Sequence, residues 1–304
     1  MNKNPFSIYD FLGYLFPGLV VLLTVVYVYY SECDSINCLF SVRNFEKVFT
    51  EELLFAKWQS TAILIVLSYI AGHIIAYLSS VIVEKFSVTL FKYPSIFLLH
   101  SDDSESEEIS RLRDFRRLFC RYFRFTRNFG SKFWRVVVFF ILLPVSVPML
   151  LGVLLSLNQF IVRPLDEYVR NSILGKLNRL AEKLQITPPD VNSEEDFHRI
   201  VMHYVYINIP NCQRKTDNYV AMYGFLRAMT LIACLLFDYY FVKMVAISII
   251  AAFSDVIEVS FDLYALINFI LLSVICNILF MGFVKYYRRF TLENLMTLLT
   301  EKES

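Results

Sequence analysis

Four long apolar segments, separated by polar segments of contrasting charge, dominate the pattern of the chain. They are Tyr9–Tyr30, Thr61–Val83, Tyr219–Phe241 and Tyr264–Tyr287. Each is close to the roughly 20 residues that an α-helix needs to cross the hydrocarbon core of a bilayer. The pattern therefore predicts an all-α, polytopic membrane protein with about four transmembrane helices.

A fifth apolar segment, Val136–Val162, is long enough to cross as well, but Pro144 and Pro148 interrupt it. Each proline removes a backbone donor and disfavours helix at the residue before it. Non-helical backbone at membrane depth is tolerated only where it is buried in protein or lines a water-filled cavity. We therefore expect a re-entrant or in-plane helix pair here, with an ordinary kinked span as the alternative.

The distribution of charge predicts the orientation, because Lys and Arg concentrate in the loops that stay cytoplasmic. Residues 84–135 carry eleven Lys/Arg and seven Asp/Glu, whereas residues 31–60 carry three and five. Four spans with both termini inside agree with these counts, whereas five would place Arg288 and Arg289 outside. We expect a multi-pass protein of the bacterial inner (cytoplasmic) membrane, with cytoplasmic N and C termini.

This topology divides the chain into three parts. Residues 1–83 form a first transmembrane hairpin, and residues 219–304 form a second hairpin with a cytoplasmic tail. Residues 84–218 form a helical cytoplasmic domain that includes the apolar segment 136–162. The composition, 57% apolar with 29 phenylalanines, agrees with a largely membrane-embedded chain.

Helical periodicity continues outside the spans. Residues 164–185 carry one apolar stripe, which predicts an amphipathic helix. We expect a further short cytoplasmic helix at Glu194–Ile207 and an amphipathic helix in the tail 290–304. His198 and His203 are five residues apart and therefore on different faces, and we interpret both as surface residues.

The basic segment Arg111–Arg135 is the first candidate binding site, with nine Lys/Arg against one acidic residue. Its arginines recur at helical spacing, and aromatic residues lie on another face. One interpretation is a juxtamembrane helix resting on anionic lipid. Others are an oligonucleotide or nucleotide site, with Arg on phosphates and rings stacked on bases, and an acidic protein partner. The candidate ligand-binding residues are Arg113, Arg116, Arg117, Arg121, Tyr122, Arg124 and Arg127.

Polar and small residues within the spans form the second candidate group. Polar residues are costly in a membrane and usually face a bundle interior or an aqueous path. Small residues recur every fourth position from Ser68 to Ser80, a ridge that permits close helix contact and, we expect, self-association. Ser273 and Asn277 lie one helical turn apart. Pore lining and helix packing both stay open as roles for the group Ser68, Gly72, His73, Ala76, Ser273 and Asn277.

The sequence contains no P-loop, HExxH, GxSxG or Cys-x2-Cys motif. We therefore expect no enzymatic activity, no cofactor and no metal site. Cys33 and Cys38 are close enough to form a disulfide in an oxidising compartment, and two unpaired thiols are the alternative. The other cysteines show no metal-ligand spacing, and we interpret them as packing residues.

The opening string Tyr9-Asp-Phe-Leu-Gly-Tyr-Leu-Phe-Pro-Gly18, followed by Ala71-Gly-His-Ile-Ile, resembles a group of small bacterial membrane proteins. This group is similar to the membrane effectors of antiphage-defence operons, among them the membrane-subunit family of the Hailong system. The resemblance implies a channel-like oligomer held shut by a short DNA oligomer, which a partner nucleotidyltransferase makes. It covers about 30 residues and transfers no ligand-binding residue to this chain.

Together these observations predict an oligomeric inner-membrane effector, a channel or pore gated by an anionic ligand such as a short oligonucleotide. It would act in antiviral defence by disrupting the membrane. Its expected partners are membrane lipid, further copies of the chain and the oligonucleotide. The alternative is a non-conducting membrane scaffold that recruits a soluble partner, and a membrane-embedded enzyme is a third interpretation.

Overall fold

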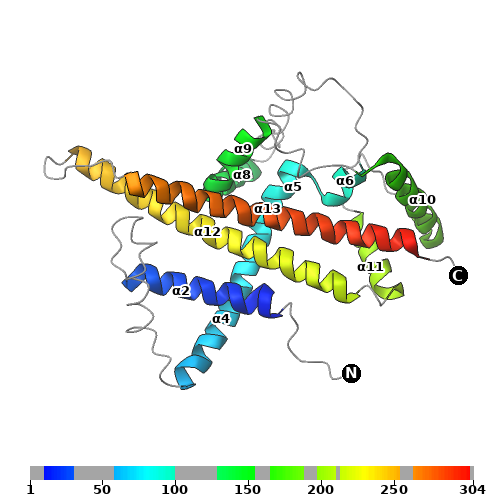
Figure 1. The fold of residues 1–304 in the computed structure, drawn as a ribbon, viewed down its shortest axis with the longest axis horizontal. Coiled ribbons are helices and arrows are strands. Elements are labelled where there is room, and N and C mark those ends of the chain that lie inside the picture. Colours follow the sequence, from blue (N-terminus) through cyan, green and yellow to red (C-terminus); the bar gives the residue numbers. More distant parts are fainter. Residues whose placement is uncertain are drawn as a thin grey trace. The chain divides into compact units, whose positions relative to one another are not determined.

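The computed structural model describes residues 10–30, 58–99, 129–154, 165–187, 197–209, 213–253 and 263–301. These residues are almost entirely helical and include no β-strand (Figure 1). Four helical segments are long and apolar enough to cross a membrane. They are Phe11–Tyr29, Thr61–Leu99, Gln213–Ile249 and Leu266–Thr300. The prediction of an α-helical membrane protein with four candidate spans is therefore confirmed.

The first candidate span begins with a short π-helix, η1 (Phe11–Leu15), which runs into α2 (Phe16–Tyr30). The N–H of Phe16 donates to the carbonyl of Phe11, five residues back. Pro17 has no N–H for the α-helical bond to Gly13, which favours this wider turn at the start of α2. The next described helix, α4 (Trp58–Ser79), also passes into a π-helix, η4 (Ser80–Glu84), and crosses α2 (Figure 1).

The chain divides into two compact units. The first combines residues 1–83, 136–148 and 224–280, so it contains most of the apolar length of the spans. Helices α12 (Gln213–Phe253) and α13 (Leu263–Thr300) each contribute a part to this unit and a part to the second. Two buried clusters hold this unit together. One joins α2, α12 and α13 through Tyr27, Phe237, Tyr240 and Leu272, and the other joins α4 to α12 through Ile75, Ala228 and Ile232.

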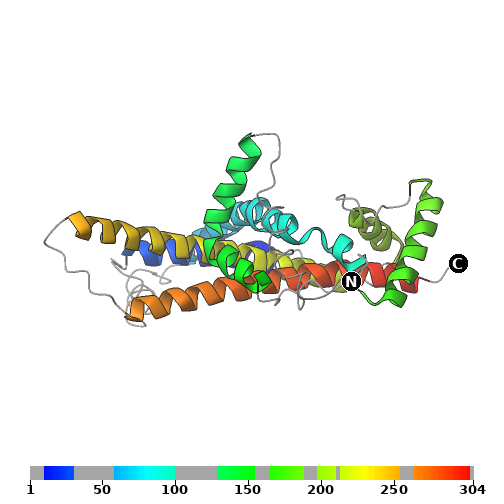
Figure 2. The ribbon, with the colours of Figure 1, turned by 90° about the horizontal axis from the view of Figure 1, so that it is seen from above.

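The apolar segment that contains the prolines forms two helices, α8 (Phe129–Ile141) and α9 (Leu143–Leu154), with a break at Leu142. Pro144 lies in the first turn of α9, where its missing N–H costs little, and Pro148 lies inside the helix. The Ser146 hydroxyl donates across the break to the Phe139 carbonyl at 3.1 Å. Figure 2 shows the chain turning sharply between the two helices.

The second unit combines residues 84–135, 149–223 and 281–304. Its described elements are α5 (Lys85–Phe91), α6 (Pro94–Leu99), α10 (Glu167–Leu184), α11 (His198–Asn208), the start of α12 as far as Tyr223 and the end of α13 from Met281. A buried core of mostly aliphatic side chains lies among α6, α10, α11 and the end of α13. Figure 2 shows these helices gathered near the C-terminus. The backbone N–H of Leu165 donates to the Leu98 carbonyl at 3.0 Å and fixes the chain where α10 begins.

The amphipathic helix expected over residues 164–185 is present as α10. Its stripe is buried at Ile173, Leu177 and Leu180, but Leu184, at the last turn, is 42% exposed. The predicted tail helix is the continuation of α13, with Leu295 and Leu298 buried. The sequence did not predict α5 and α6, whose tight connection places Lys92 at φ 65°.

Candidate functional site

A polar cleft lies among η1, α4 and α12 within the first unit. Its volume is about 250 Å³. Its lining includes two residues that the sequence singled out, His73 and Ala76, together with several that it did not. The full lining is Gly13, Tyr14, His73, Ala76, Tyr77, Gly224 and Arg227.

Two glycines bring the walls of the cleft together. A Cβ atom added to Gly18 would overlap the backbone carbonyl of Ser68, and one added to Gly72 would overlap the carbonyl of Tyr14. Helix α2 and η1 therefore lie so close to the backbone of α4 that only small residues fit at the contact. The Ser68–Gly72 part of the predicted ridge is thus in contact with the same chain, and self-association of the protein stays a prediction.

An aromatic cluster surrounds His73. The Tyr14 ring stacks on the imidazole with centroids 3.9 Å apart and planes 20° apart. The Tyr69 ring meets the imidazole edge-on, at 4.6 Å and 82°. These two contacts fix the plane of the His73 ring at the cleft, where its nitrogen atoms can exchange hydrogen bonds with a polar ligand.

Arg227 supplies the positive charge of the cleft. Its Nε donates to the Ser79 hydroxyl at 3.2 Å, and one terminal nitrogen donates to the Ala76 carbonyl at 3.4 Å. An arginine at the centre of a membrane helix costs about 2.5–3.5 kcal/mol on insertion scales, and such residues are commonly functional. The sequence analysis did not select Arg227, although the sequence could have revealed it. Arg227 is the only charged residue between Tyr219 and Phe237 in the third apolar segment.

One π-helical segment lines this cleft, and a second begins three residues after Tyr77 of its lining. Gly13 and Tyr14 belong to η1, and η4 begins directly after Ser79. In the turn before η4, the hydroxyls of Ser79 and Ser80 donate to the carbonyls of Ala76 and Tyr77, at 2.9 and 2.7 Å. π-Helical turns are rare and occur frequently at functional sites. The π-helical turn of η1 in its lining, together with Arg227, marks the cleft as the candidate site.

The other predicted polar pair of the spans, Ser273 and Asn277, contacts the segment with the prolines. The amide nitrogen of Asn277 donates to the Pro144 carbonyl at 2.7 Å, and the Ser273 hydroxyl donates to it at 3.1 Å. In a regular helix this carbonyl would accept from residue 148, but Pro148 has no N–H. The two side chains of α13 therefore satisfy an acceptor that the proline leaves without its helical donor, which is a helix-packing contact.

In the second unit, one histidine prediction was wrong. His198 is buried, and its Nε2 lies 3.1 Å from the amide nitrogen of Asn294. Phe290 meets the imidazole edge-on at 5.2 Å. The spacing between His198 and His203 could not predict which of them is buried, because the burial of His198 depends on how α11 is rotated against α13. His203 is exposed, as predicted.

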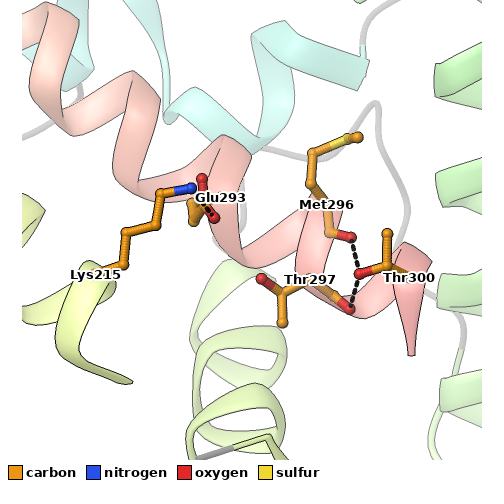
Figure 3. Close-up of polar contacts among 5 residues, drawn as sticks. All are labelled: Lys215, Glu293, Met296, Thr297 and Thr300. Carbon is orange, nitrogen blue, oxygen red and sulfur yellow. Dashed lines mark hydrogen bonds and ion pairs between the residues drawn. The ribbon is translucent and has the colours of Figure 1, made fainter. Parts of the chain in front are cut away.

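Polar contacts also fix the end of α13. Tyr204 donates to the Glu301 carboxylate at 2.9 Å, and Lys176 donates to the Glu301 backbone carbonyl at 3.3 Å. Lys183 donates to the Tyr204 hydroxyl, and this hydrogen bond is the main reason why the pKa of Lys183 is raised. Figure 3 shows the neighbouring ion pair, in which Lys215 of α12 contacts Glu293 at 2.6 Å. Such solvent-exposed pairs contribute only about 0–1 kcal/mol each.

Several predicted residues lie outside the part of the chain that the structure describes. These are all seven candidate ligand-binding residues of the basic segment, together with Cys33, Cys38, Cys120 and Cys212. Cys234 and Cys276 are buried in α12 and α13 and form no disulfide. No group of three metal-ligating side chains occurs among the described residues.

Comparison with known proteins identifies no relative of this chain. No protein-family model matches the chain, and neither the curated proteins nor the solved structures give a match. The class of protein, an α-helical membrane protein with four candidate spans, therefore rests on the helices themselves.

Proposed function

We propose that this chain is a membrane effector whose spans form a channel or pore controlled by an anionic ligand. The observation that carries the proposal is the broken helix pair α8–α9 and its contact with α13. Ser273 and Asn277 lie near the middle of the apolar run Tyr264–Tyr287, so the Pro144 carbonyl that they bind lies at about the same depth.

Broken helices at mid-membrane depth are typical of proteins that move solutes across the bilayer. Irregular backbone there must be buried in protein or line a water-filled cavity, and discontinuous helices commonly form the substrate and ion sites of transporters. The break at Leu142, reinforced by the Ser146 hydroxyl bond, fits this class of element. It also supports the re-entrant interpretation of the segment.

Two features support control by an anion. The segment Arg111–Arg135 carries nine Lys/Arg against one acidic residue, and Arg227 places a further cation in the cleft among the spans. Helices α12 and α13 each contribute residues to both compact units. A ligand that contacts α12 or α13 in one unit therefore touches a helix that continues into the other unit.

The resemblance of Tyr9–Gly18 to antiphage effectors extends the proposal to antiviral defence. In that setting the protein would assemble as a homo-oligomer in the bacterial inner membrane, with cytoplasmic termini. A nucleotidyltransferase encoded next to this chain would support an oligonucleotide as the ligand.

Membrane potential in cells that express the full chain tests the proposal. We expect expression without a regulator to depolarise the membrane, as reported by uptake of a potential-sensitive dye. Asn277→Leu should reduce the depolarisation at equal membrane abundance, because it removes the shorter of the two side-chain hydrogen bonds to the Pro144 carbonyl. Val274→Leu is the matched control, since Val274 lies on the same helix and is 46% exposed.

Two results would contradict the proposal. A normal membrane potential in cells whose growth the protein inhibits would favour the non-conducting scaffold. Equal depolarisation by the wild type and Asn277→Leu would show that the contact with Pro144 has no part in the permeability pathway.

A further inference from the structure

We propose that the cleft lined by Tyr14, His73, Tyr77 and Arg227 binds a phosphate group, carried by a phospholipid or by a small soluble phosphate ester. The proposal concerns binding only. It does not depend on the proposed function, because occupancy of the cleft and depolarisation of the membrane are separate measurements.

The charge and the hydrogen-bonding groups of the cleft select the class of ligand. Arg227 makes an anion the favoured occupant, and its planar guanidinium matches the oxygens of a phosphate. Tyr77 and Tyr14 carry hydroxyl groups, and His73 carries ring nitrogens, on two other walls. Residues that carry hydrogen-bonding groups on three elements can together meet more of the four oxygens of a phosphate than the two of a carboxylate.

The size of the cleft agrees with a substituted phosphate. Liquid water takes about 30 Å³ per molecule, so a cavity of about 250 Å³ has room for roughly eight waters. Two glycines, Gly13 and Gly224, lie in its lining and leave space where side chains would intrude. A Cβ atom built on Gly224 meets no atom within 4 Å.

The depth of the cleft brings it within reach of both sources of phosphate. Tyr14 lies five residues from the start of the first apolar segment, Tyr77 six from the end of the second, and Arg227 eight from the start of the third. At 1.5 Å per residue these positions are about 7–12 Å from the corresponding helix ends. In the four-span topology all three ends are cytoplasmic, where phospholipid headgroups and soluble esters both occur.

Binding to the purified full-length protein in detergent is the test, with two pairs of probes. Dioleoylphosphatidic acid is compared with dioleoylglycerol, and glycerol 3-phosphate with glycerol. Within each pair the only difference is the phosphate. The readouts are the shift of the thermal unfolding midpoint and the bound mass in native mass spectrometry.

We expect at least one phosphate compound to bind where its phosphate-free counterpart does not. A response to phosphatidic acid alone identifies the lipid headgroup, and a response to glycerol 3-phosphate identifies a soluble ester. Arg227→Gln should weaken the apparent affinity by roughly tenfold or more, the size expected for a hydrogen bond to a charged group. Arg214→Gln, on an exposed position of the same helix, should bind as the wild type does.

A second variant keeps the test decisive if Arg227→Gln does not fold. Gly224→Leu fills the cleft while leaving Arg227 in place, and its Cβ atom meets open space. It should unfold near the wild-type temperature yet lose phosphate binding. The proposal is overturned if neither phosphate compound binds better than its counterpart, or if both folded variants bind as the wild type does.

Discussion

Asn294 and His198 form a polar contact inside an otherwise apolar core. Asn294 is 1% exposed and His198 is 6% exposed, so water cannot replace the hydrogen bond between them. The neighbouring side chains are mostly aliphatic, with Phe290 beside the imidazole. A buried polar pair of this kind adds little net stability when made but costs much when half of it is removed.

We therefore predict that Asn294→Ala lowers the stability of the protein by about 1–3 kcal/mol, the cost of leaving a buried group without this partner. The change should appear as a lower thermal unfolding midpoint in detergent. Asn178→Ala, at an exposed position of α10, is the matched control and should unfold like the wild type. Replacing both partners, as His198→Phe with Asn294→Leu, should recover part of the loss.

An unchanged midpoint in Asn294→Ala relative to Asn178→Ala would contradict this assignment. It would mean that the contact between the amide and the imidazole adds nothing to the folded protein.

At the scale of elements, glycines determine how closely the helices approach. Gly18 and Gly72 lie where the backbones of α2, η1 and α4 touch, whereas Gly224 faces open space. The same substitution should therefore have opposite effects at different glycines. A methyl group at Gly72 must push a backbone carbonyl away, but at Gly224 it only improves helix propensity.

We predict that Gly72→Ala destabilises the protein by about 1–3 kcal/mol, as overpacking of a close contact does. Gly224→Ala should stabilise it by up to about 1 kcal/mol, because glycine is a poor helix former. Thermal unfolding midpoints of the two variants against the wild type measure both changes. Shifts of the same sign and size would contradict the close approach of η1 to α4.

If the ridge Ser68–Ser80 also mediates the predicted self-association, Gly72→Leu should disrupt the oligomer, because a bulky side chain separates the helix backbones. Because Gly72 faces Tyr14 of its own chain, the substitution first disturbs packing within the subunit. A change of oligomeric state is therefore informative only in a variant that still unfolds near the wild-type temperature.

At the scale of the whole molecule, the number of candidate spans does not fix the orientation of the protein in the membrane. That orientation is predicted from the distribution of Lys and Arg. If all four candidate spans cross, both termini lie on one side, and from the Lys/Arg excess of residues 84–135 we expect that side to be the cytoplasm. A fifth crossing by α8–α9 would place residues 165–218 on the opposite side.

Cysteine accessibility distinguishes these topologies. In a background with Cys33, Cys38, Cys120 and Cys212 replaced by Ser, Asn192→Cys should react with an impermeant maleimide only after the membrane is permeabilised. Asn37→Cys, in the predicted outer segment, should react in intact spheroplasts. Labelling of Asn192→Cys from outside would refute the four-span topology and favour five spans.

Much of the fold follows from local patterns in the sequence. The spans, α10 and the helical tail were predicted because apolar length and periodicity are properties of a short stretch of chain. The two short helices α5 and α6 were missed, since seven and six residues carry too little periodicity for this reasoning. The candidate site was predicted only at His73 and Ala76.

The sequence by itself determined that this chain has four segments long and apolar enough to cross a membrane, where they lie, and that proline interrupts a fifth, because these depend on transfer energies and backbone donors. Tertiary structure decided which groups meet. It buried His198 against Asn294, joined Asn277 to the Pro144 carbonyl, and gathered Tyr14, His73 and Arg227 around one cleft. The physical reason is that such encounters depend on the rotation and close packing of separate helices, which no local pattern encodes.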